Sequence, residues 1–198
     1  VDAAFDPTAT VFSAGSGNPL VSNLGTNTNG MVSWGDSSGP LDPSSNLGRS
    51  GLKLGNDPSG GGFNNPPLIT TNDLAGANTL SVTHVNHSIS GAFATLLSTE
   101  IDSSLTLWSS DRANGTPAVP ATTVSFSIKF TETPNATPCA VGTSPTPCND
   151  IFVLTSGLLN FPFVYDGNNY FLNILNVTGG GLAALTPLPN NVCAAAGA

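Results

Sequence analysis

Leu80-Ser-Val-Thr-His-Val-Asn-His-Ser-Ile89 is the longest uncharged run with the composition of a strand, and it holds both histidines. Because successive side chains of a strand point to opposite faces, His84 and His87 would face opposite ways. One face begins with Leu80 and Val82 and ends with His84, Asn86 and Ser88, which is typical of a core strand whose far end closes a turn. We expect His84 and Asn86 to hydrogen-bond nearby backbone there. A metal-binding or catalytic role for His84 is the alternative.

Thr83-His84-Val85-Asn86-His87-Ser88-Ile89 resembles the Thr-His-x-Asn-x-Pro-Ile signature of the THxN family of PEP-CTERM proteins, which are secreted bacterial surface proteins. Ser88 departs from the signature, since it stands where the family has proline. The resemblance covers roughly residues 30 to 198 and continues in these segments: Glu132-Thr-Pro-Asn135, Cys139, Cys148-Asn-Asp-Ile-Phe-Val-Leu154, Phe163-Val-Tyr-Asp-Gly167 with Tyr170, and Val192-Cys-Ala-Ala-Ala-Gly197. It implies a secreted all-β domain with no established enzymatic activity, in which Thr83, His84 and Asn86 form a structural motif.

Composition and charge limit the class of protein. The 198 residues suit one domain with one core, spanning residues 1 to 198. Charged residues make up only 8% of the chain, against roughly 25% in ordinary globular chains. The surface must therefore consist largely of Ser, Thr, Asn and Gly, which suits an extracellular or cell-surface protein. With 4 basic against 12 acidic residues the chain offers no basic patch, so we expect no nucleic-acid partner.

Neither a membrane span nor a sorting signal is visible in the sequence. No apolar run approaches the roughly 20 residues that cross a bilayer, and no signal peptide is recognisable at Val1. The family resemblance implies a C-terminal Pro-Glu-Pro, an apolar segment and a basic end, none of which is present. We expect that processing removed this tail or that the sequence stops short of it.

The three cysteines suggest an oxidising compartment. Cys139 and Cys148 flank a short loop rich in Pro and Thr, and a disulfide there would stabilise the fold by about 2.5–3 kcal/mol in the chain-entropy model. Cys193 is then left unpaired or with a partner outside the chain. Structural zinc is disfavoured, because these spacings lack the short steps between ligands that zinc sites use.

The pattern of apolar residues predicts an all-β fold. Val124, Phe126, Ile128 and Phe130 alternate with polar residues, as in a half-buried antiparallel strand. A hairpin is expected to turn at Asp166-Gly167-Asn168. The predicted strands are Ala9 to Ser13, Gly30 to Trp34, Gly51 to Gly55, Leu80 to Ile89, Ala92 to Leu97, Leu105 to Trp108, Thr122 to Phe130, Ile151 to Leu154, Phe161 to Tyr165 and Tyr170 to Val177.

Such strands without βαβ alternation favour an antiparallel β-sandwich, jelly-roll or Ig-like in outline, with a closed barrel as the second choice. The one helical turn we expect lies around Gly181 to Leu185. Residues 1 to 30 form an N-terminal arm that docks on its own sheet or, as the less favoured arrangement, donates a strand to a neighbouring molecule.

Residues 35 to 78 are dense in Gly, Pro, Asn and Asp, and we expect ligand or partner contacts there. Gly35-Asp-Ser-Ser-Gly-Pro40 resembles the nucleophile loop of trypsin-like proteases. Both histidines follow it, which is the wrong order for that family, so we interpret the segment as a turn. The acids of the region do not match an EF-hand spacing and are read as isolated surface groups: Asp36, Asp42, Asp57 and Asp73.

Few residues in the chain suggest catalysis, and we expect no catalytic site, no cofactor and no metal. Glu100 and Asp102 would share one face of a strand and could serve glycoside hydrolysis, which needs two carboxyls across a cleft. Trp34 and Tyr170 could stack against a sugar, although core packing is the default for such rings.

From the sequence we therefore expect a non-catalytic, secreted structural protein of the bacterial cell surface or extracellular matrix. Its partners would be other copies of itself, assembled into fibres by strand addition. A carbohydrate-binding module that engages matrix polysaccharide is the alternative, and a glycoside hydrolase is the weaker one.

Overall fold

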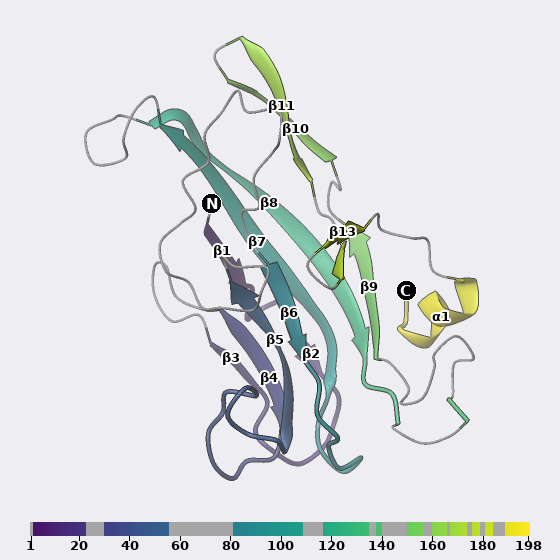
Figure 1. Ribbon diagram of the computed structural model, residues 1–198. Coiled ribbons are helices and arrows are strands. Elements are labelled where there is room, and N and C mark those ends of the chain that lie inside the picture. The colour runs from purple at the N-terminus through teal and green to yellow at the C-terminus, as the bar shows by residue number, and fades with distance from the viewer. Residues whose placement is uncertain are drawn as a thin grey trace.

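The computed structural model describes residues 2–22, 30–55, 81–108, 117–134, 138–139, 150–156, 160–165, 167–173, 176–178, 181–183 and 189–198. These residues form an antiparallel β-sandwich, as predicted (Figure 1). The first sheet has the order β1-β7-β8-β9, with β2 also paired to β7, and the second has the order β3-β4-β5-β6. The strands of the first sheet are β1 (Asp2–Phe5), β2 (Val11–Phe12), β7 (Leu96–Trp108), β8 (Pro117–Thr131) and β9 (Ile151–Ser156).

The second sheet is a meander of consecutive strands. They are β3 (Leu20–Ser22), β4 (Met31–Gly35), β5 (Arg49–Gly55) and β6 (Ser81–Val85). Two separate hairpins follow the sandwich in sequence, and a short helix ends the chain: β10 (Asn160–Tyr165) with β11 (Asn168–Asn173), β12 (Asn176–Thr178) with β13 (Gly181–Ala183), and α1 (Asn190–Ala195).

The core lies between the two sheets, where apolar side chains from alternate positions meet. In β8, Phe126, Ile128 and Phe130 are buried while Thr123 and Ser125 are exposed, which confirms the predicted alternation. The main core cluster draws on both sheets: Phe5, Val32, Trp34, Leu52, Leu54, Leu96, Ile101, Ile128 and Phe130. Burial of these faces is the principal force that holds the two sheets together.

The N-terminal arm pairs with its own chain. Strand β1 runs antiparallel to β7, with Ala4 opposite Asp102 and Phe5 opposite Ile101. Phe5 is only 1% exposed and belongs to the main core. Farther along the arm, the hydroxyls of Thr10 and Thr99 lie 2.8 Å apart in a hydrogen bond. The arm is thus part of the sandwich in this chain.

The segment between β4 and β5 is a turn, as predicted, and it is fixed by a buried arginine. The Ser38 backbone N–H donates to Asp36 at 2.9 Å. Arg49 is fully buried and donates to Ser33 Oγ at 2.8 Å, to the Asn18 carbonyl at 2.8 Å, and to the Asp36 carbonyl. One guanidinium therefore ties the arm and this turn to the second sheet.

The predicted hairpin after Phe161 is confirmed. Tyr165 lies opposite Asn168 in the β10–β11 pairing, and Gly167 adopts a φ of 71°, which residues with a Cβ rarely do. Figure 1 shows this hairpin beyond one end of the two sheets. Val164 and Phe171 on one of its faces are 62% and 56% exposed.

Two expectations about elements are wrong. Residues 92–97 and 105–108 were expected in separate strands, but one strand, β7, begins at Leu96 and continues to Trp108. Its polar middle is extended because β1 and β8 pair with it on either side. The expected helical turn at Gly181 to Leu185 is also wrong, since Gly181–Ala183 is strand β13.

The helix forms later, at Asn190–Ala195, directly after Pro189. Pro189 has a φ of -58° and a ψ of 146°, so it lies outside the helix, and the alanines that follow favour helix. Val192 and Ala196 pack on Ile151 and Val153 of β9, in a small second core.

Candidate functional site

Titratable side chains from β6, from just past the end of β8 and from just before β9 meet beside β6. We call this group the His84 cluster, and it consists of Trp34, His84, Glu132, Asp150 and the ring of Phe130. Leu52 lies opposite both Val32 and His84 in the strand pairing, so His84 points from β6 to the face that carries the core. Glu132 follows Phe130 by two residues just past the end of β8, and Asp150 immediately precedes β9.

Two aromatic rings fix the imidazole of His84. The ring of Trp34 stacks with it at a centroid distance of 6.3 Å and an interplanar angle of 20°. Phe130 meets it edge-on at 5.1 Å and 75°. The His84 side chain remains 29% exposed, so solvent reaches the imidazole from outside. The imidazole therefore forms the boundary between core and solvent.

The carboxyl of Asp150 is almost fully buried, with a side chain that is 2% exposed. Its Oδ1 accepts hydrogen bonds from the Thr133 backbone N–H at 2.8 Å and from the Thr133 hydroxyl at 3.3 Å. Its Oδ2 is buried without a hydrogen-bond partner and lies 3.5 Å from His84 Nε2. One oxygen of this carboxyl is thus oriented and satisfied, while the other faces the imidazole.

Glu132 supplies a second carboxyl to the cluster. Its Oε2 accepts a hydrogen bond from Trp34 Nε1 at 2.8 Å. Trp34 is completely buried, and this bond satisfies its ring N–H, as buried tryptophans require.

Burial shifts all three titratable groups of the cluster towards their neutral forms. It raises the pKa of Glu132 to about 7, helped by the charge of Asp150 and opposed by the hydrogen bond from Trp34. Burial also raises the pKa of Asp150, against the hydrogen bonds from Thr133 and the charge of His84. It lowers the pKa of His84, against the charge of Asp150. Such a site favours a bound proton or a bound cation over bare carboxylates.

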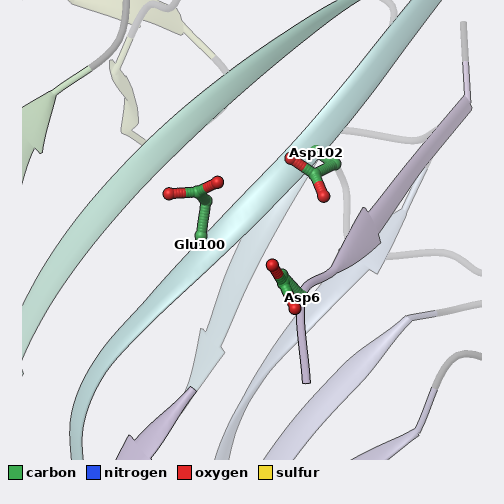
Figure 2. A group of neighbouring side chains, drawn as sticks. All are labelled: Asp6, Glu100 and Asp102. Carbon is green, nitrogen blue, oxygen red and sulfur yellow. The ribbon is translucent and has the colours of Figure 1, made fainter. Parts of the chain in front are cut away.

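A second group of acids lies on the outer face of the first sheet. Carboxylate oxygens of Asp6, Glu100 and Asp102 lie within 4.8 Å of one another, and Figure 2 shows them converging from β7 and from the chain just after β1. Hydroxyls occupy part of them, since Ser127 donates to Glu100 at 2.9 Å and Ser125 donates to Asp102 at 2.5 Å.

The acids of β7 share one face, as the sequence predicts for residues two apart. They come from a single strand, however, whereas glycoside hydrolysis needs carboxyls on the two sides of a scissile bond. This arrangement adds no support to the hydrolase alternative. The third acid, Asp6, accepts from the backbone N–H and hydroxyl of Thr8, and these bonds lower its pKa.

The two histidines differ from the expected roles. His84 faces a carboxyl instead of nearby backbone, and Asn86 lies exposed past the end of β6. His87 is the one tied to backbone, with Nε2 at 3.1 Å from the Pro43 carbonyl. Its own N–H and carbonyl both bond to Ser50 Oγ. Thr83 lies on the opposite face of β6 from His84, opposite Lys53 of β5.

The structure separates the two aromatic residues considered for sugar stacking. Trp34 is buried and has no ring face to offer a ligand. Tyr170 is partly exposed on the β10–β11 hairpin, where it stacks on Phe163 at 5.5 Å and 17°.

The remaining site predictions concern cysteines and isolated acids. Cys148, Asp57 and Asp73 lie outside the described residues, so the bridge between Cys139 and Cys148 stays a prediction. Cys193 is half-buried on α1 beside the small second core, and its predicted external partner is likewise untested. Asp42 forms an ion pair with Lys53 at 3.0 Å.

His84 is visible as a candidate in the sequence, but its partners Glu132 and Asp150 are not. Glu132 and Asp150 stand at the end of one predicted strand and the start of the next, so pairing of those strands would have placed them together. Nothing in the sequence linked them to β6 of the other sheet. Asp6 is separated from Glu100 by most of the first half of the chain, and no local signal joins the two.

Comparisons with known proteins identify no relative: no family model matches, and searches of curated proteins and of solved structures returned no significant match. The resemblance to the THxN family therefore rests on the motif and the segments already described. Among the described residues, no helix is long and apolar enough to cross a membrane.

Proposed function

We propose that this chain is a non-catalytic structural protein of a bacterial cell surface or extracellular matrix, where it joins further copies of itself by strand addition. The observation that carries the proposal is the position of β1. This strand lies near the N-terminus, pairs antiparallel with one edge of β7, and inserts Phe5 into the core. A neighbouring copy could supply the same strand in the same register, because the contacts are identical within one chain and between two.

The surface of the protein supports association. A chain with 8% charged residues has few like charges to hold copies apart, although its net charge of -8 keeps some repulsion. The β10–β11 hairpin adds exposed apolar side chains at one end of the sandwich. Exposed apolar residues grouped on one face commonly mark contact surfaces.

Disulfide trapping tests the exchange of β1 directly. Ala4 and Asp102 stand opposite each other, and the Cα atoms of such residues are about 4.5–5.5 Å apart, within the range that a disulfide spans. Two single variants, Ala4→Cys and Asp102→Cys, are prepared with Cys193→Ser in both backgrounds and mixed under oxidising conditions. Strand exchange gives a cross-linked dimer on non-reducing gels, since only pairing between chains can form this bond.

A mixture of Ala4→Cys with Val164→Cys is the matched control, because the hairpin residue is exposed but does not face β1. We expect no specific dimer from it. Failure of the first mixture to cross-link above this control, together with monodisperse monomers in electron microscopy of the native protein, would refute assembly by strand addition.

A polysaccharide-binding module is the second candidate, favoured by the aromatic face of the β10–β11 hairpin. Phe163 and Tyr170 stack there, and Tyr165 lies 6.2 Å from Tyr170. Partly exposed aromatic rings on one face can pack against the apolar faces of sugars.

Polysaccharide co-sedimentation with Tyr170→Ala tests this second candidate. We expect loss of binding if the aromatic face is the site. Phe171→Ala alters the opposite face of the same strand and serves as the control, so it should bind normally. Equal binding by both variants and the wild type would exclude the aromatic face.

A further inference from the structure

The buried carboxyl of Asp150 has one oxygen without a hydrogen bond, and the contact described for it is the long ion pair with His84. Thr133 holds Oδ1 with two donors, which fixes the plane of the carboxyl. Oδ2 is buried without a hydrogen bond, in a side chain that is 2% exposed. A buried carboxyl oxygen without a hydrogen bond is costly, and native proteins almost always provide it with a partner.

An imidazole nitrogen lies near this oxygen at a distance that suits a shared ion. His84 Nε2 lies 3.5 Å from Asp150 Oδ2, which is long for a hydrogen bond. Two ligand atoms that each bind a tetrahedral ion at about 2.1 Å are about 3.4 Å apart. The observed separation therefore matches that of two ligands on one metal ion.

The imidazole is also held in place and accessible. Trp34 and Phe130 fix the ring from two sides, so its orientation needs no metal to be set. The His84 side chain is 29% exposed, so an ion approaches the site from the side of the imidazole. Thr133, which donates to the other oxygen of Asp150, occupies the supporting position that metal-binding carboxylates usually have.

The charge of the surroundings favours a cation. Glu132 adds a second carboxyl close enough for the charge of Asp150 to act on it. Among the described basic residues, Arg49 donates to backbone carbonyls and Lys53 pairs with Asp42. Lys129 stands opposite Ser98, at a polar position of β8. None of these cations compensates the His84 cluster.

We propose that His84 Nε2 and Asp150 Oδ2 bind a divalent transition-metal ion, with Zn²⁺ as the best match. An imidazole ligand favours zinc over calcium and magnesium, which take oxygen ligands. Water completes the coordination, while Glu132 keeps its hydrogen bond from Trp34 and acts as a nearby carboxyl, not as a ligand. Such an ion would connect β6 of one sheet with the start of β9 of the other.

Zinc titration of the purified 198-residue chain tests this site. The protein is stripped with a chelator, dialysed, and titrated with ZnCl₂ by calorimetry, and Co²⁺ is used in parallel to report ligand geometry by its absorption. We expect one ion per chain and a rise in melting temperature. His84→Gln and Asp150→Asn should each weaken binding by more than the roughly 10–100-fold that loss of a supporting residue causes.

Two control variants separate this site from other ligands in the chain. His87→Gln removes the other histidine, and Asp102→Asn disrupts the acidic group on β7. Both should bind zinc as the wild type does. Should Asp150→Asn fail to fold, His84→Gln decides the matter, because its side chain is at the boundary with solvent. Unchanged affinity in His84→Gln, or the absence of stoichiometric binding by the wild type, would overturn the proposal.

Discussion

Burial of Glu132 in the His84 cluster should make the stability of the protein depend on pH. Its pKa rises from 4.5 to about 7 on folding. The folded protein therefore holds more protons than the unfolded chain between these values, and the contribution of Glu132 to stability falls as the pH rises through this window. Above pH 7 the ionised carboxylate destabilises the fold relative to a neutral side chain.

Glu132→Gln should therefore stabilise the protein in a pH-dependent manner. The amide oxygen can still accept the hydrogen bond from Trp34, but the side chain cannot ionise. We expect no gain at pH 4 and a gain on the order of 2 kcal/mol at pH 8, after discounting for solvent screening. Urea unfolding across this pH range, with a chelator present, measures the difference. A gain that is the same at every pH would contradict the assignment.

Arg49 is the second residue whose role is set by burial. Its guanidinium satisfies three acceptors from different parts of the chain, and it is fully buried. A lysine cannot reach all three acceptors from a single nitrogen, and each buried acceptor left unpaired costs about 1–3 kcal/mol. We expect Arg49→Lys to lower the free energy of unfolding by about 2–4 kcal/mol in chemical denaturation.

Lys53→Ala is the matched comparison for this substitution. Lys53 forms its ion pair with Asp42 at the surface, where the two side chains are 21% and 43% exposed. Surface pairs contribute about 0–1 kcal/mol, so the loss should be small. If Arg49→Lys proved no more harmful than Lys53→Ala, the three hydrogen bonds would not matter for stability.

Among the strands, the sequence predicts those whose own residues alternate between apolar and polar and are bounded by turn residues. It does not predict strands whose extended conformation depends on pairing with neighbouring strands. Strand β8 and the β10–β11 hairpin were predicted because their apolar residues alternate and Gly167 marks the turn. The same patterns predict two strands in place of β7, since its middle is polar and becomes extended only between β1 and β8.

The candidate site, too, is predicted only where a local pattern marks its residues. His84 stood out in the sequence because it belongs to a clear strand, but Glu132 and Asp150 lie at strand ends with no apolar pattern of their own. The contact between them and His84 depends on how the two sheets stack, which local patterns do not encode. The buried state of Arg49 was missed for the same reason, because its acceptors come from the arm and the turn after β4.

In the whole molecule, burial of Phe5 makes β1 an integral part of the sandwich. The ring is 1% exposed and packs in the cluster that joins the two sheets. Truncation of such a buried phenylalanine costs about 3–5 kcal/mol. We expect Phe5→Ala to lose this amount in a single transition that is the same by Trp fluorescence and by circular dichroism, because Trp34 belongs to the same core.

Val164→Ala is the control for that measurement. The side chain of Val164 is 62% exposed, so its truncation should change the free energy of unfolding by no more than about 0.5 kcal/mol. A loss from Phe5→Ala as small as this control would mean that β1 leaves the sheet at little cost in an isolated chain. The edge of β7 would then be open to a strand from another copy, and cross-linking between Ala4→Cys and Asp102→Cys chains should become easier in the Phe5→Ala background. A large loss would instead mean that exchange requires partial unfolding, and assembly should then be slow and accelerate with denaturant.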